Sequence, residues 1–192
     1  YSAPPVLPEE DILADIQDAG IELLAAAGYE QYEISAYARD KKRARHNLNY
    51  WEFGDYLGIG AGAHGKITLP AEDKILRLWK TRLPKHYLDA ANSQKISTNL
   101  GGHQNTFGGG SDLLLPDGLP LEFMMNALRL TAGVPQRFFT ARTGLDWQAV
   151  ATPWQQLTQQ GLVEIVQGAV RPTALGRRFL NRVLQGFMPL EP

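Results

Sequence analysis

The sequence predicts an α/β fold followed by a small winged-helix-like α+β domain. A helical pattern of apolar residues over 8–27 leads into a strand-like segment at 32–35, which is the helix-then-strand order of α/β proteins. From residue 119 onward, helical patterns are followed by a short hairpin signal. Between these parts, residues 92–118 are rich in glycine and poor in apolar residues. We therefore expect an α/β part over 1–91, a linker over 92–118 and the small domain over 119–192.

The first helix is expected to begin near Pro8, because the N–H that proline lacks is not used at a first helical position. Acidic residues at 9–11 suit the positive end of the helix dipole, and Gly28 suits the position after the last turn. Apolar residues at helical spacing predict one buried face, formed by Ile12, Leu13, Ile16, Leu23, Leu24 and Ala27. A further helix is expected over 73–91, interrupted at Pro84.

Segment 32–65 concentrates the functional residue types of the chain. It holds a predicted strand at 32–35, a second and more buried strand at 56–60, and a glycine-rich turn over 60–65. Glycine lets a backbone approach a ligand closely, and such a turn at the carboxyl end of a strand is where α/β folds place ligands. No Gly-Lys-Ser/Thr follows the glycines, so the turn is not a Walker loop.

A basic loop separates these two strands, with five basic residues around Asp40: Arg39, Lys41, Lys42, Arg43 and Arg45. Two interpretations remain open, a solvated loop and a clamp for anionic groups, since guanidinium groups pair with carboxylates. His46 follows the loop beside Tyr50 and Trp51. Such a histidine is commonly structural, although imidazole can also ligate haem iron and the two aromatic rings could cover a flat macrocycle.

The second domain is predicted to contain helices over 122–131 and 147–160. Two strands, 162–166 and 169–171, flank Gln167-Gly168 as a hairpin, and Thr173 caps a last helix that runs to residue 184. Basic residues give that last helix a charged face: Arg177, Arg178 and Arg182. A winged helix serves protein contacts as well as DNA binding, so the fold alone does not choose between them.

Composition excludes several classes of function. The net charge of −1 argues against a general nucleic-acid binder, and no apolar run approaches the roughly 20 residues of a membrane span. The chain has no cysteine, which excludes disulfides, thiolate zinc sites and an iron–sulfur cluster carried by this chain alone. The extended start, without a signal peptide, leads us to expect the carboxyl-terminal part of a longer cytoplasmic protein.

Three segments carry a resemblance to a known family. GYEQYEIS (28–35), RHNLNYW (45–51) and GDYLGIGAGAHG (54–65) resemble the oxygen-independent coproporphyrinogen III oxidase-like proteins of the radical S-adenosylmethionine (SAM) superfamily. Within that family, residues 46–51 are similar to the HNxxYW pattern of the HemW-type haem chaperones. The resemblance implies the end of a partial (βα) barrel, SAM, and a 4Fe–4S cluster held by an amino-terminal CxxxCxxC motif. The chain departs from the family in having no cysteine and in carrying Ala36 where asparagine is usual.

The resemblance also implies site residues, none of them catalytic. His46 would ligate haem iron, Tyr50 and Trp51 would face the macrocycle, and Arg43 and Arg45 would meet its carboxylates. The implied SAM pocket consists of Glu33, Ile59, Gly60, Ala61, Gly62 and Ala63.

The function implied is haem binding and delivery to haem proteins such as respiratory cytochromes, in the cytoplasm, without nucleic acid. The absence of a transmembrane segment leaves room for peripheral membrane association. Two alternatives stand beside it: coproporphyrinogen III oxidase activity, an oxidative decarboxylation in porphyrin biosynthesis, and a winged-helix nucleic-acid-binding protein. Without cluster cysteines, we expect no radical enzyme activity from this chain by itself.

Overall fold

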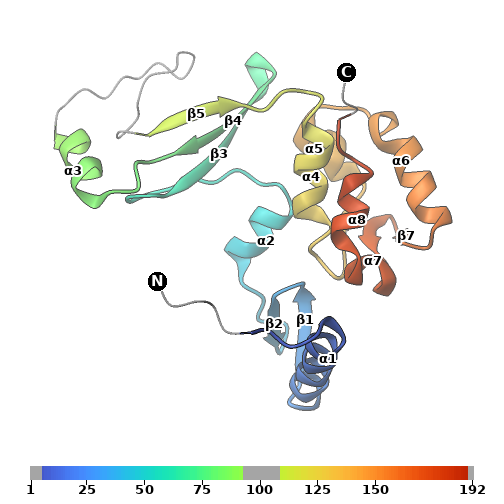
Figure 1. The fold of residues 1–192 in the computed structure, drawn as a ribbon. Helices are drawn as coiled ribbons and strands as arrows, with labels where there is room; N and C mark the ends of the chain where they lie inside the picture. Colours follow the sequence, from blue (N-terminus) through green and yellow to red (C-terminus); the bar gives the residue numbers. More distant parts are fainter. Residues whose placement is uncertain (1–5, 93–108, 190–192) are drawn as a thin grey trace. The chain divides into compact units, whose positions relative to one another are not determined.

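The computed structural model describes residues 6–92 and 109–189 (Figure 1). The chain separates into two compact units, Tyr1–Ala44 and Arg45–Pro192, each of which is described by itself. The predicted fold class is confirmed, since helices and small sheets alternate before a compact α+β region. None of the described helices is both long enough and apolar enough to cross a membrane.

The first unit is a helix followed by a hairpin. Helix α1 (Glu10–Ala26) lies alongside β1 (Tyr29–Glu33), which pairs antiparallel with β2 (Ala36–Arg39). Gly28 has a φ of +81°, so it takes the left-handed position expected after the helix. The buried residues of the hairpin are Tyr32, Glu33 and Ala38. The helix was therefore predicted correctly, whereas the strand expected at 32–35 covers Tyr29–Glu33, and residues 34–35 form the turn to β2.

The predicted buried face of α1 was wrong for the part of the chain that the structure describes. No residue of the helix is buried, and Ile16 and Leu23 are 59% and 74% exposed. The physical reason is the size of the unit: a two-stranded hairpin offers too little apolar surface to cover a helix of 17 residues.

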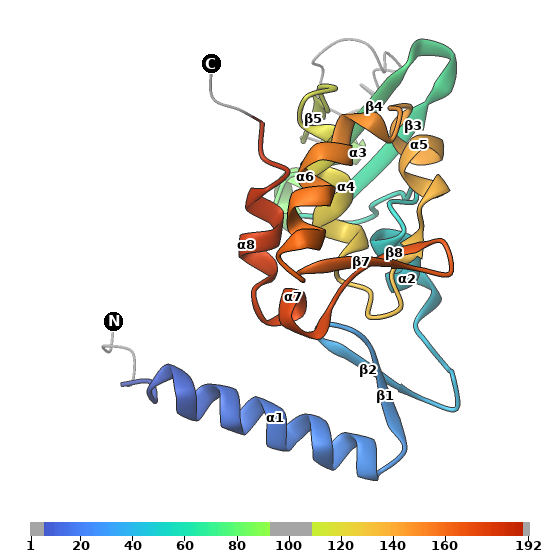
Figure 2. The ribbon, with the colours of Figure 1, turned by 90° about the vertical axis from the view of Figure 1, so that its right-hand side faces the viewer.

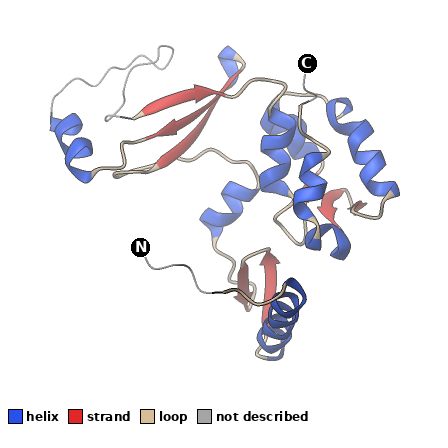
Figure 3. Cartoon of the chain, in the orientation of Figure 1, coloured by secondary structure: helices blue, strands red, loops and turns tan. Residues whose placement is uncertain are grey.

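The second unit begins with α2 (Arg45–Trp51) and a three-stranded antiparallel sheet. The sheet order is β3 (His64–Leu69), β4 (Lys74–Trp79) and β5 (Gly110–Leu113), with a short 3-10 helix, η1 (Pro70–Glu72), between β3 and β4 (Figure 3). Helix α3 (Pro84–Asn92) follows β4. In the antiparallel register, Ile67 stands opposite Leu76 and Leu76 opposite Leu113.

Two predicted elements differ from this sheet. Residues 56–60 do not form a strand: Tyr56 makes one isolated bridge to Lys66, and Ile59 is 87% exposed. Gly60 and Gly62 have φ of +101° and +72°, and this left-handed backbone ends the pairing. Residues 74–79 are strand β4 where a helix was expected, whereas helix begins at Pro84, which takes the first helical position.

The predicted linker over 92–118 is in part a strand. Residues 93–108 lie outside the described part of the chain, whereas β5 pairs with β4 and extends the sheet. The boundary between the two predicted domains stays a prediction.

The carboxyl-terminal region has the winged-helix-like layout that was expected. It comprises α4 (Leu119–Ala127), β6 (Val134–Pro135), α5 (Arg137–Thr143), α6 (Gln148–Gln159), β7 (Val163–Val166), β8 (Ala169–Pro172), α7 (Ala174–Arg178) and α8 (Leu180–Gln185). The hairpin of β7 and β8 is visible in Figure 2, and β8 also pairs with β6. Thr173 caps α7, accepting a hydrogen bond from the Gly176 backbone N–H at 3.0 Å.

Two details of this region were not predicted. Helix α5 had no clear sequence signal, and the last helix divides at Phe179, whose φ of −114° and ψ of 38° leave the helical region.

A row of aromatic rings fills the core of the second unit. Phe53, which follows α2, packs edge-on against Phe123 with ring centroids 5.7 Å apart. The row continues through Phe139, Trp147, Trp154 and Phe187. Both Phe123 and Phe139 are 0% exposed. The segment that carries His46 is thus anchored in the core of the carboxyl-terminal helices.

Candidate functional site

Helix α2 presents the aromatic and histidine side chains that the sequence singled out. His46 and Tyr50 are four residues apart and so share one face of the helix, with ring centroids 5.8 Å apart in edge contact. Tyr50 in turn meets Tyr56 at 4.3 Å. The His46 side chain is exposed to solvent.

A tight turn fixes the end of this helix. Phe53 has a φ of +58°, an unusual conformation for a large side chain that is only 1% exposed. The backbone N–H of Gly54 donates to the Asn49 carbonyl at 2.7 Å, and a Cβ at Gly54 would lie 2.1 Å from Asn49 Oδ1. Asn49 also donates from Nδ2 to the Asp55 carbonyl at 2.9 Å. Asn49 therefore stabilises the turn.

A cavity of about 350 Å³ opens beside α2 within the second unit. The residues that line it come from α2 and the following turn, the sheet, and α4: Tyr50, Trp51, Phe53, Gly54, Tyr56, His64, Lys66, Arg77 and Asn126. Its volume is at the lower end of the range for small-molecule sites. Tyr50 belongs to this lining and also contacts the His46 ring, so the cavity lies one aromatic ring away from His46.

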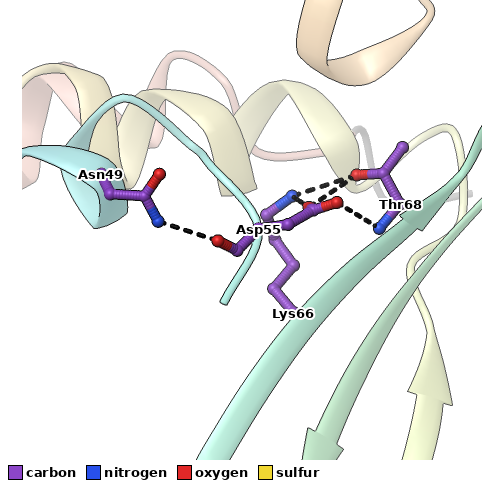
Figure 4. A network of polar contacts seen from close by, with 4 residues as sticks. All are labelled: Asn49, Asp55, Lys66 and Thr68. Atoms are coloured by element: carbon purple, nitrogen blue, oxygen red, sulfur yellow. Dashed lines mark hydrogen bonds and ion pairs between the residues drawn. The ribbon is translucent and has the colours of Figure 1, made fainter. Parts of the chain in front are cut away.

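Lys66 is a buried cation in the lining of this cavity. Its side chain is 3% exposed and donates from Nζ to Asp55 Oδ1 at 2.7 Å and to Thr68 Oγ1 at 3.3 Å (Figure 4). The ammonium also lies 4.3 Å from the centroid of the Phe53 ring, a cation–π contact. Burial lowers the pKa of Lys66 below its usual 10.5, and the hydrogen bond to Asp55 opposes that change only in part.

Asp55 is held by three hydrogen bonds. Besides Lys66, it accepts from the Thr68 hydroxyl at 2.8 Å and from the Thr68 backbone N–H at 2.9 Å. Burial by itself would raise the pKa of Asp55, but the hydrogen bonds from Lys66 and Thr68 outweigh burial and hold the pKa below 3.8. Asp55 is therefore a carboxylate at neutral pH.

A second cation of the lining, Arg77 on β4, stands opposite Lys66 in the antiparallel register. Arg77 donates from Nη2 to Glu122 Oε2 in an ion pair, while its Nε is buried and has no hydrogen-bond partner. The indole Nε1 of Trp51 is likewise buried without a partner, and the Arg129 guanidinium lies 4.3 Å from the Trp51 ring centroid. Burial raises the pKa of Tyr56, although the nearby Arg77 acts in the opposite direction.

The glycine-rich turn is shaped mainly by its own backbone. A Cβ at Gly58 would lie 2.0 Å from the His64 carbonyl oxygen, so this glycine is required by chain packing. The Gly62 N–H donates to the Thr81 carbonyl at 2.7 Å, and the Gly60 N–H donates to the Tyr87 hydroxyl at 3.2 Å. No atom lies within 4 Å of a Cβ placed at Gly60, which leaves that side of the turn open.

The predicted site residues are divided between the two units. Glu33 and Arg43 belong to the first unit, where Glu33 is 2% exposed and the Arg43 guanidinium lies 6.0 Å from the Tyr32 ring centroid. The remaining residues of the predicted haem and SAM sites belong to the second unit: Arg45, His46, Tyr50, Trp51, Ile59, Gly60, Ala61, Gly62 and Ala63. Within the second unit, Tyr50 and Trp51 meet at the cavity, whereas His46 and Arg45 do not line it.

Sequence reasoning missed the polar residues of the cavity, Lys66, Arg77 and Asn126. The available signal was a charged residue inside each of two apolar strands, HGKITL and KILRLW. Lysine is rarely buried unless it is paired, so a lysine within an apolar strand indicates a buried charge with a partner. Among the described residues, no three histidine, aspartate or glutamate side chains are placed to hold a metal ion.

Comparison with known proteins agrees with the resemblance. The family model of the HemN C-terminal domain matches residues 114–179. The heme chaperone HemW of Escherichia coli is 41% identical over 189 residues, which are 97% of this chain and 45% of that protein. HemW of Haemophilus influenzae is 40% identical over 194 residues, covering 98% of this chain and 45% of the relative. The chain thus spans less than half the length of these relatives.

A solved structure shares the fold. The radical SAM enzyme coproporphyrinogen III oxidase (HemN) from Escherichia coli matches with a TM-score of 0.61 at 18% identity, over 94% of this chain and 42% of that one. At this identity the likeness concerns the fold alone. These matches give no support to the winged-helix nucleic-acid-binding alternative. In its HNxxYW helix, its match to the HemN C-terminal domain and its identity to HemW along nearly its whole length, the chain resembles the carboxyl-terminal part of the HemW heme chaperones.

Proposed function

We propose that this chain is the haem-binding part of a HemW-like protein that delivers haem to haem proteins such as respiratory cytochromes. One observation carries the proposal: the exposed imidazole of His46 stands on α2 beside the Tyr50 ring, within a segment of the HNxxYW pattern. The relatives that are 41% and 40% identical to this chain are named heme chaperones, which supports the same assignment.

The chemistry required is within reach of these residues. A neutral imidazole nitrogen is a common axial ligand of haem iron, and an exposed imidazole is accessible to an incoming macrocycle. Tyr50 provides aromatic surface next to that ligand, and Arg45, exposed at the first position of α2, provides a cation for a carboxylate side chain. His46 thus acts as the iron ligand, and its neighbours hold the ring and its carboxylates.

The proposal extends to the cofactors of the whole protein. A 4Fe–4S cluster needs cysteine thiolates, which this chain lacks, so its ligands belong to another part of the protein. For SAM, the open side of Gly60 is compatible with a bound ligand. We keep as the proposed SAM contacts Glu33, Ile59, Gly60, Ala61, Gly62 and Ala63. A cytoplasmic location and peripheral membrane contact are parts of the same proposal.

Haem titration of the wild-type chain and its His46→Ala variant tests the assignment. We expect His46→Ala to shift or abolish the Soret band of the bound haem, because the band reports the axial ligand. His86→Ala is the matched control, since His86 is also exposed on a helix, α3, but lies outside α2 and outside the cavity lining. An unchanged Soret position and unchanged haem affinity in His46→Ala would contradict the ligand assignment.

A further inference from the structure

We propose that the cavity beside α2 binds a carboxylate group through two N–H donors, Trp51 Nε1 and Arg77 Nε. Both residues line the cavity, and both atoms are buried without a hydrogen-bond partner. Buried donors in native proteins are nearly always paired, so two unpaired donors on residues that line one cavity indicate an acceptor that arrives with a ligand. Neither donor is used by the iron ligation proposed for His46.

The charges around the cavity favour an anion. Lys66 and Arg77 line it, Arg129 lies against the Trp51 ring, and Arg142 is close enough to Lys66 to affect it electrostatically. Two carboxylates face these cations, and both are engaged: Asp55 pairs with Lys66, and Glu122 pairs with Arg77. One further negative charge would therefore enter a site with an excess of positive charge.

The shape of the donor set favours a carboxylate on an apolar molecule. Arg77 already uses Nη2 for Glu122, so its Nε offers a single N–H, and the indole offers another. A planar group with two oxygens can accept one bond from each donor. The rest of the wall is aromatic, from Tyr50, Phe53 and Tyr56, which suits a carboxylate attached to an apolar body better than a free phosphate.

The source of this carboxylate is inferred from Tyr50, and here the inference rests on the haem-binding function proposed above. The Tyr50 ring contacts the His46 ring, and Tyr50 also lines the cavity. A porphyrin placed at His46 could therefore reach the cavity with one of its carboxylate side chains. The alternative source is a small free carboxylate that occupies the cavity independently.

The test follows the indole N–H resonance of Trp51 in a two-dimensional nitrogen–proton NMR spectrum, assigned by its loss in Trp51→Phe. The chain is titrated with metal-free protoporphyrin IX, with its dimethyl ester, and with acetate. Because the metal-free porphyrin has no iron, a failure of His46 as ligand would not affect the result. We expect the diacid to move the Trp51 resonance saturably and the diester to leave it in place.

Two variants sharpen this test. Arg77→Lys keeps a cation opposite Glu122 but removes Nε, so we expect the affinity for the diacid to fall about tenfold, the usual effect of losing one charge-assisted hydrogen bond. Arg171→Lys is the matched control: Arg171 is 34% exposed against 37% for Arg77 and is also paired with a glutamate, but it does not line the cavity. The affinity of the Arg171→Lys variant for the diacid should equal that of the wild-type chain.

The outcomes separate cleanly. A Trp51 resonance that neither the diacid nor acetate moves, or that diacid and diester move equally, would overturn the carboxylate site. A resonance moved by acetate but not by the porphyrin diacid would keep the carboxylate site and overturn the porphyrin as its source. Equal losses in Arg77→Lys and Arg171→Lys would overturn the role of Arg77 Nε.

Discussion

Asp55→Asn is the most direct test of how much the buried Lys66 depends on its partner. The substitution keeps the size of the side chain but removes its charge and replaces one acceptor oxygen by an NH₂ group. Lys66, 3% exposed, then loses its ionic partner Asp55, and the backbone N–H of Thr68 faces a donor in place of Oδ2. The perturbation therefore acts on one ion pair and one backbone hydrogen bond.

The matched control is Glu72→Gln in the same unit. Its ion pair with Lys74 has nearly the same length, 2.9 Å against 2.7 Å, but both side chains are exposed, by 42% for Lys74 and 52% for Glu72. A hydrogen bond to a charged group contributes about 1.5–3 kcal/mol where water is excluded. Because Asp55 is itself 44% exposed, we discount this to about 1–2 kcal/mol for Asp55→Asn, and we expect at most about 0.5 kcal/mol for Glu72→Gln.

The free energy of unfolding should be measured by urea denaturation with tryptophan fluorescence. All four tryptophans, at 51, 79, 147 and 154, lie in the second unit, so the signal reports that unit alone. Equal losses of stability in the two variants would refute the reasoning from burial.

The same experiment has a defined dependence on pH. The pKa of Asp55 lies below 3.8 in the folded chain. Between that lower pKa and pH 3.8, the Asp55 carboxyl therefore binds more protons in the unfolded state than in the folded state. The stability contributed by Asp55 is therefore present above pH 3.8 and is lost as the pH falls through the lower folded pKa. We expect the difference between wild type and Asp55→Asn to shrink over that range.

Three further predictions concern other parts of the chain. Phe53→Ala should lower the free energy of unfolding in urea by about 3–5 kcal/mol, because it empties a fully buried aromatic site. Phe179 is 55% exposed, so Phe179→Ala should lower it by under about 1 kcal/mol, and similar losses in the two variants would contradict the packing described. Gly58→Ala should cost about 1–3 kcal/mol in the same assay, since the new methyl group meets the His64 backbone, and a neutral effect would mean that the turn relaxes freely. Reconstitution of this chain with iron and sulfide should give no visible cluster absorbance, because it has no cysteine, and a stoichiometric cluster would contradict this.

Local signals predicted the carboxyl-terminal region well. Thr173 caps a helix, as expected from its position before a helical pattern, and Gln167 and Gly168 form the turn between β7 and β8 with φ of 51° and 77°. Both features depend on a few neighbouring residues, which is why the sequence reveals them.

Pairings between distant segments could not be predicted in the same way. Apolar residues at 75, 76, 78 and 79 fit a helix as well as a strand, and the choice is made by pairing with β3 and with β5, which lies beyond residues 93–108. Likewise, 56–60 has the composition of a strand, but the left-handed glycines at 60 and 62 prevent the pairing from continuing.

The candidate site was predicted in part for the same reason. The sequence indicated Tyr50 and Trp51, and both line the cavity, because their position on one short helix is a local property. Lys66 and Arg77 come from two strands, so their place in the lining depends on the register of β3 against β4. That register follows from tertiary packing and is not written in either strand alone.

The aromatic row from Phe53 to Phe187 limits how far this protein can be divided. Phe53 directly follows the helix that carries His46, and its ring packs against Phe123 in α4. A peptide that ends between β5 and α4 would keep the HNxxYW segment but would lose Phe123, so Phe53 would be exposed. The turn that orients Trp51 and Asp55 would then lose its anchor in the core. The match to the family model begins at residue 114, after Phe53 and α2. The start of that match is therefore not the boundary of the packed aromatic core. Transplanting helix α2 into another protein would therefore require transplanting the aromatic residues of the carboxyl-terminal helices that pack against Phe53.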